Sequence, residues 1–506
     1  MDAELPGESQ LVSKAPRALA LSFLNGIATR VGTLGIGIAL ARVIGPADFG
    51  IYAVALLALT AALSFNELGV SLAIVRWPDD PRAIAPTVAT ISLGASACIA
   101  AAGYLVAPSF ASAMGEPAAT NIVRVMALSV LVSGAVATPA ALMQRQFMQE
   151  KRMLVDQVNT WGGAITSLVL AIGGMGAMSL AVGRIAGSAA AMILFVRFSP
   201  QPFRLGFDRA VVARLLRFGV PLAGASIVVF AIGFSDQLVA GHVLGSTALG
   251  FYVLAYNLSS WPVQMFSLPL RNVAPPTFAR LQHEPAAMRR TLRSIVGLLA
   301  AITFPICLVL AGAAEPLIRF VYGAAWTPAA SALVWLGILA AFRILFELAY
   351  DYLVVVGVSR SILALQLVTL AALVPALIVG AHAFGIAGAA AAQVVVAGVV
   401  ALPLYLLLFR RAGVPVRTVL GRLWLPVLIA AGAGLSAMGL ARALPSDIAA
   451  IVLAGLVGLA ALAGLVYRDR GELQRLRGSA LASAAEPARP AVREPGPVPR
   501  PVEVVA

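Results

Sequence analysis

Long apolar runs, separated by short stretches that carry charges, glycine or proline, dominate this chain. Most runs are about 20 residues long, the length that an α-helix needs to cross the roughly 30 Å hydrocarbon core of a bilayer. They lack the alternation over about ten residues that marks transmembrane β-strands. The pattern therefore predicts an all-α polytopic membrane protein with about fourteen transmembrane helices.

The predicted spans form two sets of six and a final pair. We expect a cytoplasmic amino terminus over 1–17, an N-lobe over 18–200, a C-lobe over 201–417, two further spans within 418–468, and a disordered cytoplasmic tail over 469–506, which is rich in Pro, Ala, Arg and Glu. The spans are 18–41, 49–75, 85–107, 125–143, 154–175 and 178–196, then 218–241, 249–268, 295–314, 329–349, 362–383 and 386–408, then 424–441 and 448–467.

An internal repeat relates the two lobes. Residues 43–55 align without gaps on residues 243–255, with one Val, two Gly, one Tyr and one Ala identical. The copies are six spans apart, an even number, so the lobes insert in the same orientation and form parallel repeats about an axis along the membrane normal. A weaker match, 176–181 with 385–390, opens the sixth span of each lobe.

The repeated glycines have a structural interpretation. We expect Gly45 and Gly245 to let the chain turn sharply between helices, and Gly50 and Gly250 to let the next helix press against a neighbour.

Composition supports a membrane protein. Hydrophobic residues make up 60% of the 506 residues and charged residues 11%, with a mean hydropathy of +0.93. A soluble chain of this size needs a far more polar surface. The polar first 17 residues lead directly into a full-length span, so we expect no cleavable signal peptide.

Basic residues predict the orientation. Of the 36 lysines and arginines, 28 fall in the amino terminus, the tail and the connectors after even-numbered spans, and four fall in the opposite connectors. Because cytoplasmic loops accumulate Lys and Arg, both termini are expected in the cytoplasm. The net charge of +14 is spread over every inner connector, which argues against a nucleic-acid partner.

The sequence offers little for catalysis. It lacks a Gly-x-x-x-x-Gly-Lys-Ser/Thr loop for nucleotide phosphates and a His-Glu-x-x-His zinc pair. The three histidines are scattered, and Cys98 and Cys307 lie in predicted spans as small hydrophobic residues. We therefore expect no enzyme activity, cofactor or metal.

Two stretches resemble a known family. Leu40-Ala-Arg-Val-Ile-Gly-Pro-Ala-Asp-Phe-Gly-Ile-Tyr52, followed by Glu67-Leu-Gly-Val70, resembles the amino-terminal signature of the Wzx-type polysaccharide flippases of the multidrug, oligosaccharidyl-lipid and polysaccharide exporter superfamily. Residues 236–252 resemble that family's junction between spans seven and eight, except that Gln237 stands where a basic residue is expected.

The resemblance implies a function. It implies alternating-access transport of undecaprenyl-diphosphate-linked oligosaccharide to the periplasmic face of the cell inner membrane, for exopolysaccharide, capsule or O-antigen (lipopolysaccharide) synthesis. The polysaccharide polymerase and the chain-length machinery are possible partners, besides membrane lipid. Three alternatives stay open: a membrane-embedded polysaccharide polymerase or ligase, a lipid II flippase, and a drug or cation antiporter of the same superfamily.

Charged residues within spans or at their edges are the candidate site. Arg30, Arg184, Arg271 and Arg343 are candidates for binding a diphosphate, because a guanidinium group offers paired donors to phosphate oxygens. Asp236, Glu67, Glu347 and Asp351 are candidates for binding a coupling ion or for pairing helices. The alternative is structural: these residues tie helices together or lie at the interface, and Arg343 and Glu347 are spaced for an ion pair along one helix.

Overall fold

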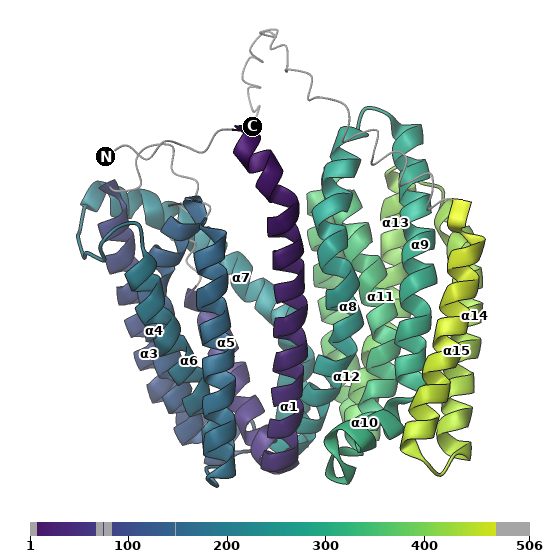
Figure 1. The fold of residues 1–506 in the computed structure, drawn as a ribbon, viewed down its shortest axis with the longest axis horizontal. Coiled ribbons are helices and arrows are strands. Elements are labelled where there is room, and N and C mark those ends of the chain that lie inside the picture. The colour runs from purple at the N-terminus through teal and green to yellow at the C-terminus, as the bar shows by residue number, and fades with distance from the viewer. Residues whose placement is uncertain (1–7, 67–73, 75–82, 147, 472–506) are drawn as a thin grey trace, which may run out of the picture.

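The computed structural model describes residues 8–66, 74, 83–146 and 148–471, and this part is a bundle of helices without a β-strand (Figure 1). The apolar segments form helices because, in a bilayer, the backbone polar groups of a helix are hydrogen-bonded within their own segment. The helices are α1 (Glu8–Asn66), α3 (Ala85–Ala113), α4 (Thr120–Arg145), α5 (Gln149–Ile172), α6 (Ala177–Phe198), α7 (Arg209–Leu244), α8 (Ser246–Arg280), α9 (Pro285–Gly312), α10 (Ala314–Tyr322), α11 (Ala329–Val356), α12 (Ser359–Val396), α13 (Leu402–Arg411), α14 (Val416–Ala443) and α15 (Asp447–Arg468).

Two of these helices contain a break. Gly45 in α1 has non-helical backbone angles, and so do Phe384 and Gly385 in α12, so each label covers two helical segments. In the described part of the chain, nine helices are long and apolar enough to cross a membrane. The predicted all-α polytopic class is confirmed, whereas the number fourteen stays a prediction.

Helix ends differ from the apolar runs. The α8 helix continues to Arg280, well beyond the predicted end at residue 268, so Arg271 lies inside a helix and not just past it. Hydropathy marks only the part of a helix that suits lipid, and a helix whose backbone stays hydrogen-bonded continues into the interface. The end predicted at residue 75 for the second span lies outside the described residues.

The helices form two halves. In Figure 1, α3 to α6 lie on one side, α8 to α15 lie on the other, and the first segment of α1 descends between them. The repeat assigns α1 to the first half and α7 to the second. The start of α1 and the end of α15 share one end of the bundle, and α10 lies at the opposite end. We call the end with the start of α1 and the end of α15 the inner end, and the end with α10 the outer end. The inner end carries the basic connectors that are predicted to be cytoplasmic.

The largest buried cluster joins the two halves. It contains Val54 and Met126 from the first half and Tyr252, Trp326 and Leu333 from the second. Because this apolar core is continuous across the joint, the two halves are packed against each other in this structure.

The α7 helix connects the halves. Its first turns bring Val211 and Leu215 against Ile84 and Leu142 of the first half, whereas Ala240 near its other end belongs to the joint cluster. One helix therefore starts on one half and ends where the halves meet, as its oblique course in Figure 1 shows.

Backbone angles support the repeat. Gly45 and Gly245 have φ values of 77° and 84°, and both end one helix and begin the next, as predicted. Gly176 and Gly385 have nearly the same conformation, with φ/ψ of 52°/−136° and 59°/−141°. Positive φ is a conformation that only glycine adopts readily, so the two halves share their turns as well as their helices.

The structure adds a third pair of matching turns. Gly115 and Gly323 both have positive φ, and each precedes a short 3₁₀ turn, Pro117–Ala119 in one half and Ala324–Trp326 in the other. The two connectors differ in length between the glycine and a shared Pro-Ala-Ala, 117–119 in one half and 328–330 in the other. The α10 helix, which is absent from the sequence prediction, lies just before the second turn.

An ion pair fixes α10 to the last helix. The Arg319 guanidinium of α10 donates to Oδ2 of Asp447 at 2.7 Å, and its second nitrogen contacts Oδ1. This hydrogen bonding raises the pKa of Arg319. The carboxylate also lies in the first turn of α15, where the helix dipole favours a negative charge.

Candidate functional site

The two halves meet at the outer end through pairs of contacts that the repeat relates. Arg42 of α1 donates from Nε to the carbonyl of Val321 at 2.8 Å, and from its terminal nitrogen to the carbonyl of Phe320 at 2.5 Å. His242 of α7, the equivalent of Arg42 at an offset of 200, lies with Nδ1 at 2.5 Å from the carbonyl of Ala113. Each half thus uses a cationic or imidazole side chain to hold the end of a helix of the other half.

Trp326 fills the space between the repeated turns. It is 1% exposed, and its indole Nε1 donates to the Ala41 carbonyl at 3.0 Å. The rings of Phe49 and Phe251 meet it edge-on, with centroids at 5.3 and 5.9 Å. Buried aromatic rings of this kind contribute much of the apolar energy of an interface.

The repeated glycines meet at the same place. A Cβ on Gly50 would overlap the backbone of Ser246, and a Cβ on Gly250 would lie 2.9 Å from the Cα of Gly50. The Ser246 hydroxyl donates to Oε2 of Glu116 at 2.6 Å. Both halves therefore close against each other at the outer end, and we call the set Arg42, Gly50, Glu116, His242, Ser246, Gly250 and Trp326 the outer gate.

A buried polar cluster lies in the second half. Asp236 of α7 is 3% exposed, and its Oδ2 accepts from the Tyr252 hydroxyl of α8 at 2.9 Å and from Nε2 of Gln393 in α12 at 3.2 Å. Its Oδ1 accepts from the backbone N–H of Gln237 at 2.8 Å, and Gln393 also donates to the Tyr252 oxygen. Asp236 thus joins three helices, as the helix-pairing interpretation expects.

The first half holds the equivalent pair. The Tyr52 hydroxyl interacts with the Arg184 guanidinium of α6. Tyr52 matches Tyr252 at an offset of 200, and Arg184 matches Gln393 at the offset of 209 that relates Gly176 to Gly385. Each half thus has a polar contact between the same two positions of the repeat. One of these positions holds Arg184 in the first half and Gln393 in the second.

Arg343 of α11 lies beside the Asp236 cluster. Its guanidinium donates to the Ser260 hydroxyl at 3.3 Å and stands 5.0 Å from the centroid of the Tyr256 ring. Tyr256 lies one helical turn after Tyr252 on α8. Arg343 is half-buried, and its contacts with Ser260 and Tyr256 place it at the edge of the polar cluster.

Arg343 also lines a cavity of about 300 Å³ in the second half. Arg271 of α8 lies in the same wall, and its Nε is 3.8 Å from Oδ1 of the buried Asp351. The cavity is lined by Arg271, Arg343, Phe346, Glu347, Tyr350, Gln366 and Tyr405. It combines two guanidinium groups and one carboxylate with aromatic and amide side chains, so the described lining has an excess of positive charge and groups that suit an anionic ligand with hydroxyl groups.

The structure brings some of the predicted residues together and separates others. Arg271, Arg343 and Glu347 share the cavity, and Asp351 is paired with Arg271. Arg343 and Glu347 form no ion pair in the described part of the chain, so the proposed pairing along the helix is not seen there. Arg184 is exposed in the other half. The side chain of Arg30, and all of Glu67, lie outside the described residues.

Sequence reasoning missed the neutral polar residues of the site. Tyr252, Gln366 and Gln393 lie within apolar runs, and a search for charges alone passes over them. A glutamine in an apolar span is a usable signal, because its amide must find a hydrogen-bonding partner in the bundle. Among the described residues, no three His, Cys, Asp or Glu side chains are placed to hold a metal ion.

Known proteins are similar to this chain in sequence. A family model described as "Polysaccharide biosynthesis protein" matches residues 39–331. The lipopolysaccharide biosynthesis protein WzxC of Escherichia coli (strain K12) is 25% identical over 308 residues, which cover 60% of this chain and 62% of that protein. The succinoglycan biosynthesis transport protein ExoT of Rhizobium meliloti (strain 1021) is 24% identical over 311 residues, 59% of this chain and 62% of that protein. The chain thus matches about three fifths of the length of these relatives.

Solved structures share the architecture. The lipid II flippase MurJ in an inward closed conformation superposes with a TM-score of 0.73 at 13% identity, over 89% of this chain and 99% of that one. An inward-facing multidrug resistance MATE family transporter of the MOP superfamily gives 0.60 at 15% identity, over 75% and 94%. At these identities the likeness concerns the fold alone. With a family model that matches more than half of its residues and this two-lobed helical fold, the chain belongs to the polysaccharide biosynthesis protein family.

Proposed function

We propose that this chain is a flippase that moves undecaprenyl-diphosphate-linked oligosaccharide repeat units from the cytoplasmic to the periplasmic face of the inner membrane. The observation that carries the proposal is the placement of Arg271 and Arg343 in one cavity of a two-lobed fold whose outer end is closed. The names of the relatives, lipopolysaccharide biosynthesis and succinoglycan transport, support a polysaccharide pathway.

The physical problem of such transport is the diphosphate. Its charge cannot cross hydrocarbon, whereas guanidinium groups offer paired N–H donors to phosphate oxygens in a wet cavity. Arg271, at 51% side-chain exposure, is accessible to a ligand, although its Nε also lies 3.8 Å from Oδ1 of Asp351. Tyr350, Gln366 and Tyr405 add hydroxyl and amide groups that suit a sugar.

Alternating access accounts for the closed outer gate. In this state the contacts of Arg42, His242 and Trp326 hold the outer end shut, and a substrate enters from the inner end. Release at the other face requires these contacts to break while inner contacts form. A ligand shifts the balance only by binding one of the two states more tightly than the other.

Deletion of the gene tests this function in cells. The flippase proposal predicts that complete lipid-linked repeat units accumulate on the cytoplasmic face and that polymer export stops. Single repeat units already at the periplasmic face would instead indicate a polymerase. Accumulation of the peptidoglycan precursor lipid II would indicate a lipid II flippase.

A further inference from the structure

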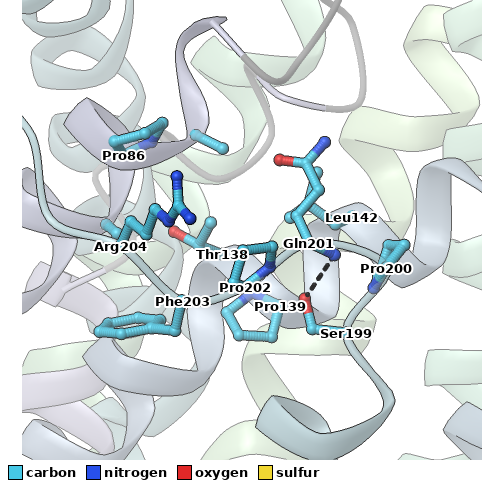
Figure 2. Close-up of a pocket in the computed structure, with 12 residues that line it drawn as sticks. Pro86, Thr138, Pro139, Leu142, Ser199, Pro200, Gln201, Pro202, Phe203 and Arg204 are labelled. Atoms are coloured by element: carbon cyan, nitrogen blue, oxygen red, sulfur yellow. Dashed lines mark hydrogen bonds between the residues drawn. The ribbon is translucent and has the colours of Figure 1, made fainter.

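A second polar cavity lies at the inner end of the first half, away from the arginines of the C-lobe. It has a volume of about 400 Å³ and lies between α3, α4 and residues 199–204 of the linker that connects α6 to α7 (Figure 2). Its walls include Pro86, Thr138, Pro139, Ser199, Gln201 and Arg204. We call it the linker pocket.

The linker forms a fixed wall of this pocket. The N–H of Gly206 donates to the Pro86 carbonyl at 3.2 Å, and the Thr90 hydroxyl donates to the Gly206 carbonyl at 2.7 Å. A Cβ on Gly206 would lie 2.8 Å from the Cβ of Pro86, so glycine permits this close approach. Prolines 200 and 202 further restrict the backbone of this segment.

One polar group in the pocket has no partner among the described residues. Thr138 of α4 is 4% exposed, and its Oγ1 makes no hydrogen bond within that part of the chain. A buried hydroxyl without a partner costs free energy, and native proteins usually satisfy such groups with another residue, a water or a ligand. The hydroxyl lines the cavity, where a ligand atom can reach it.

Arg204 supplies a positive charge beside this hydroxyl. Figure 2 shows the Arg204 guanidinium and the Thr138 hydroxyl turned toward each other, both within the pocket wall. Among the described residues, the pocket lining includes no Asp or Glu. A guanidinium fork and a hydroxyl donor together match an anion with several oxygens, of which phosphate is the most common at a membrane surface.

We propose that the linker pocket binds a phosphate group, with Arg204 and Thr138 as its ligands. Its position at the inner end, among the basic connectors, matches the headgroup of an acidic phospholipid, and a soluble phosphate has the same chemistry. A bound phosphate would join the linker to α4 and so hold the segment that connects the two lobes.

The test is lipid retention by the purified full-length chain in native mass spectrometry. The probes are phosphatidylglycerol, the zwitterionic phosphatidylcholine, and inorganic phosphate as a competitor. We expect Arg204→Gln to lower phosphatidylglycerol retention roughly tenfold and Thr138→Val to lower it severalfold. The control Arg410→Gln removes an exposed charge from the last turn of α13, remote in sequence, and should leave retention unchanged.

Either of two lipid-retention results would overturn the proposal: equal loss in Arg204→Gln and Arg410→Gln, or equal retention of the two lipids with no effect of phosphate. Displacement of phosphatidylglycerol by millimolar inorganic phosphate would support the site and identify a soluble source. Thermal unfolding of Thr138→Val without added lipid controls for folding, because loss of an unpartnered hydroxyl should not lower Tm. A clearly lower Tm would show that the hydroxyl has a partner within the protein and would also contradict the proposal.

Discussion

At the scale of single residues, Asp236 shows how a charge inside a membrane protein can be structural. Both of its carboxylate oxygens accept hydrogen bonds, and the donors come from α7, α8 and α12. Such a carboxylate is already satisfied, and a proton or sodium ion would compete with these donors. Substitutions at Asp236 can therefore distinguish its two predicted roles, helix pairing and ion coupling.

Substitutions at Asp236 and Tyr252 test this point. Asp236→Asn keeps an oxygen acceptor, so we expect its stability to stay close to wild type, whereas Asp236→Ala removes the acceptor of three donors and should cost about 1–3 kcal/mol. Tyr252→Phe should cost about 1 kcal/mol. Thermal unfolding in detergent measures both. If Asp236→Asn unfolds like the wild type but abolishes transport, the charge itself is required and ion coupling is the better interpretation.

Glycines 50 and 250 give a second prediction at this scale. Gly50→Ala places a methyl group against the Ser246 backbone, which cannot move away easily, and should destabilise the present state by about 1–3 kcal/mol. Gly455→Ala in α15 is the matched control, because a Cβ there meets nothing within 4 Å. Unfolding curves of the two variants provide the comparison. Equal stability would mean that the two halves do not meet as closely as this structure shows.

At the scale of elements, the outer gate is a contact between turns and helix ends. The sequence predicted the positive-φ role of Gly45 and Gly245 and the close packing of Gly50 and Gly250, because those residues lie in the aligned repeat. It did not predict Trp326 as their neighbour. Trp326 lies in a connector outside the aligned repeat. It is 285 residues away from Ala41 in sequence, and only tertiary packing brings the two into contact.

Loss of Trp326 should open the gate. In a chain without Cys98 and Cys307, a cysteine replacing the buried Ser246 reports access from the outer face to a membrane-impermeant maleimide. Trp326→Ala removes the ring that Phe49 and Phe251 contact, so we expect severalfold faster labelling. The control Trp424→Ala removes an exposed ring of α14 and should not change the rate. Unchanged labelling in Trp326→Ala would show that this ring does not hold the gate.

At the scale of the whole molecule, the class was predictable and the site only partly so. Hydropathy and the repeat predict two parallel helical lobes, because lipid imposes long apolar helices and duplication preserves turn glycines. The pairing of Arg271 with Asp351, and the absence of a pair between Arg343 and Glu347 in the described structure, depend on how α8 turns against α11. Sequence spacing along one helix carries no information about that contact.

Transport by the reconstituted chain tests the central claim most directly. Vesicles that contain the wild-type protein should move a fluorescent undecaprenyl-diphosphate-linked oligosaccharide between leaflets. The double variant Arg271→Gln, Arg343→Gln should slow this movement roughly tenfold or more, because it removes two charge-assisted donors from the cavity. Arg410→Gln, Arg411→Gln is the matched control and should transport like the wild type. Equal rates in both double variants would contradict the account.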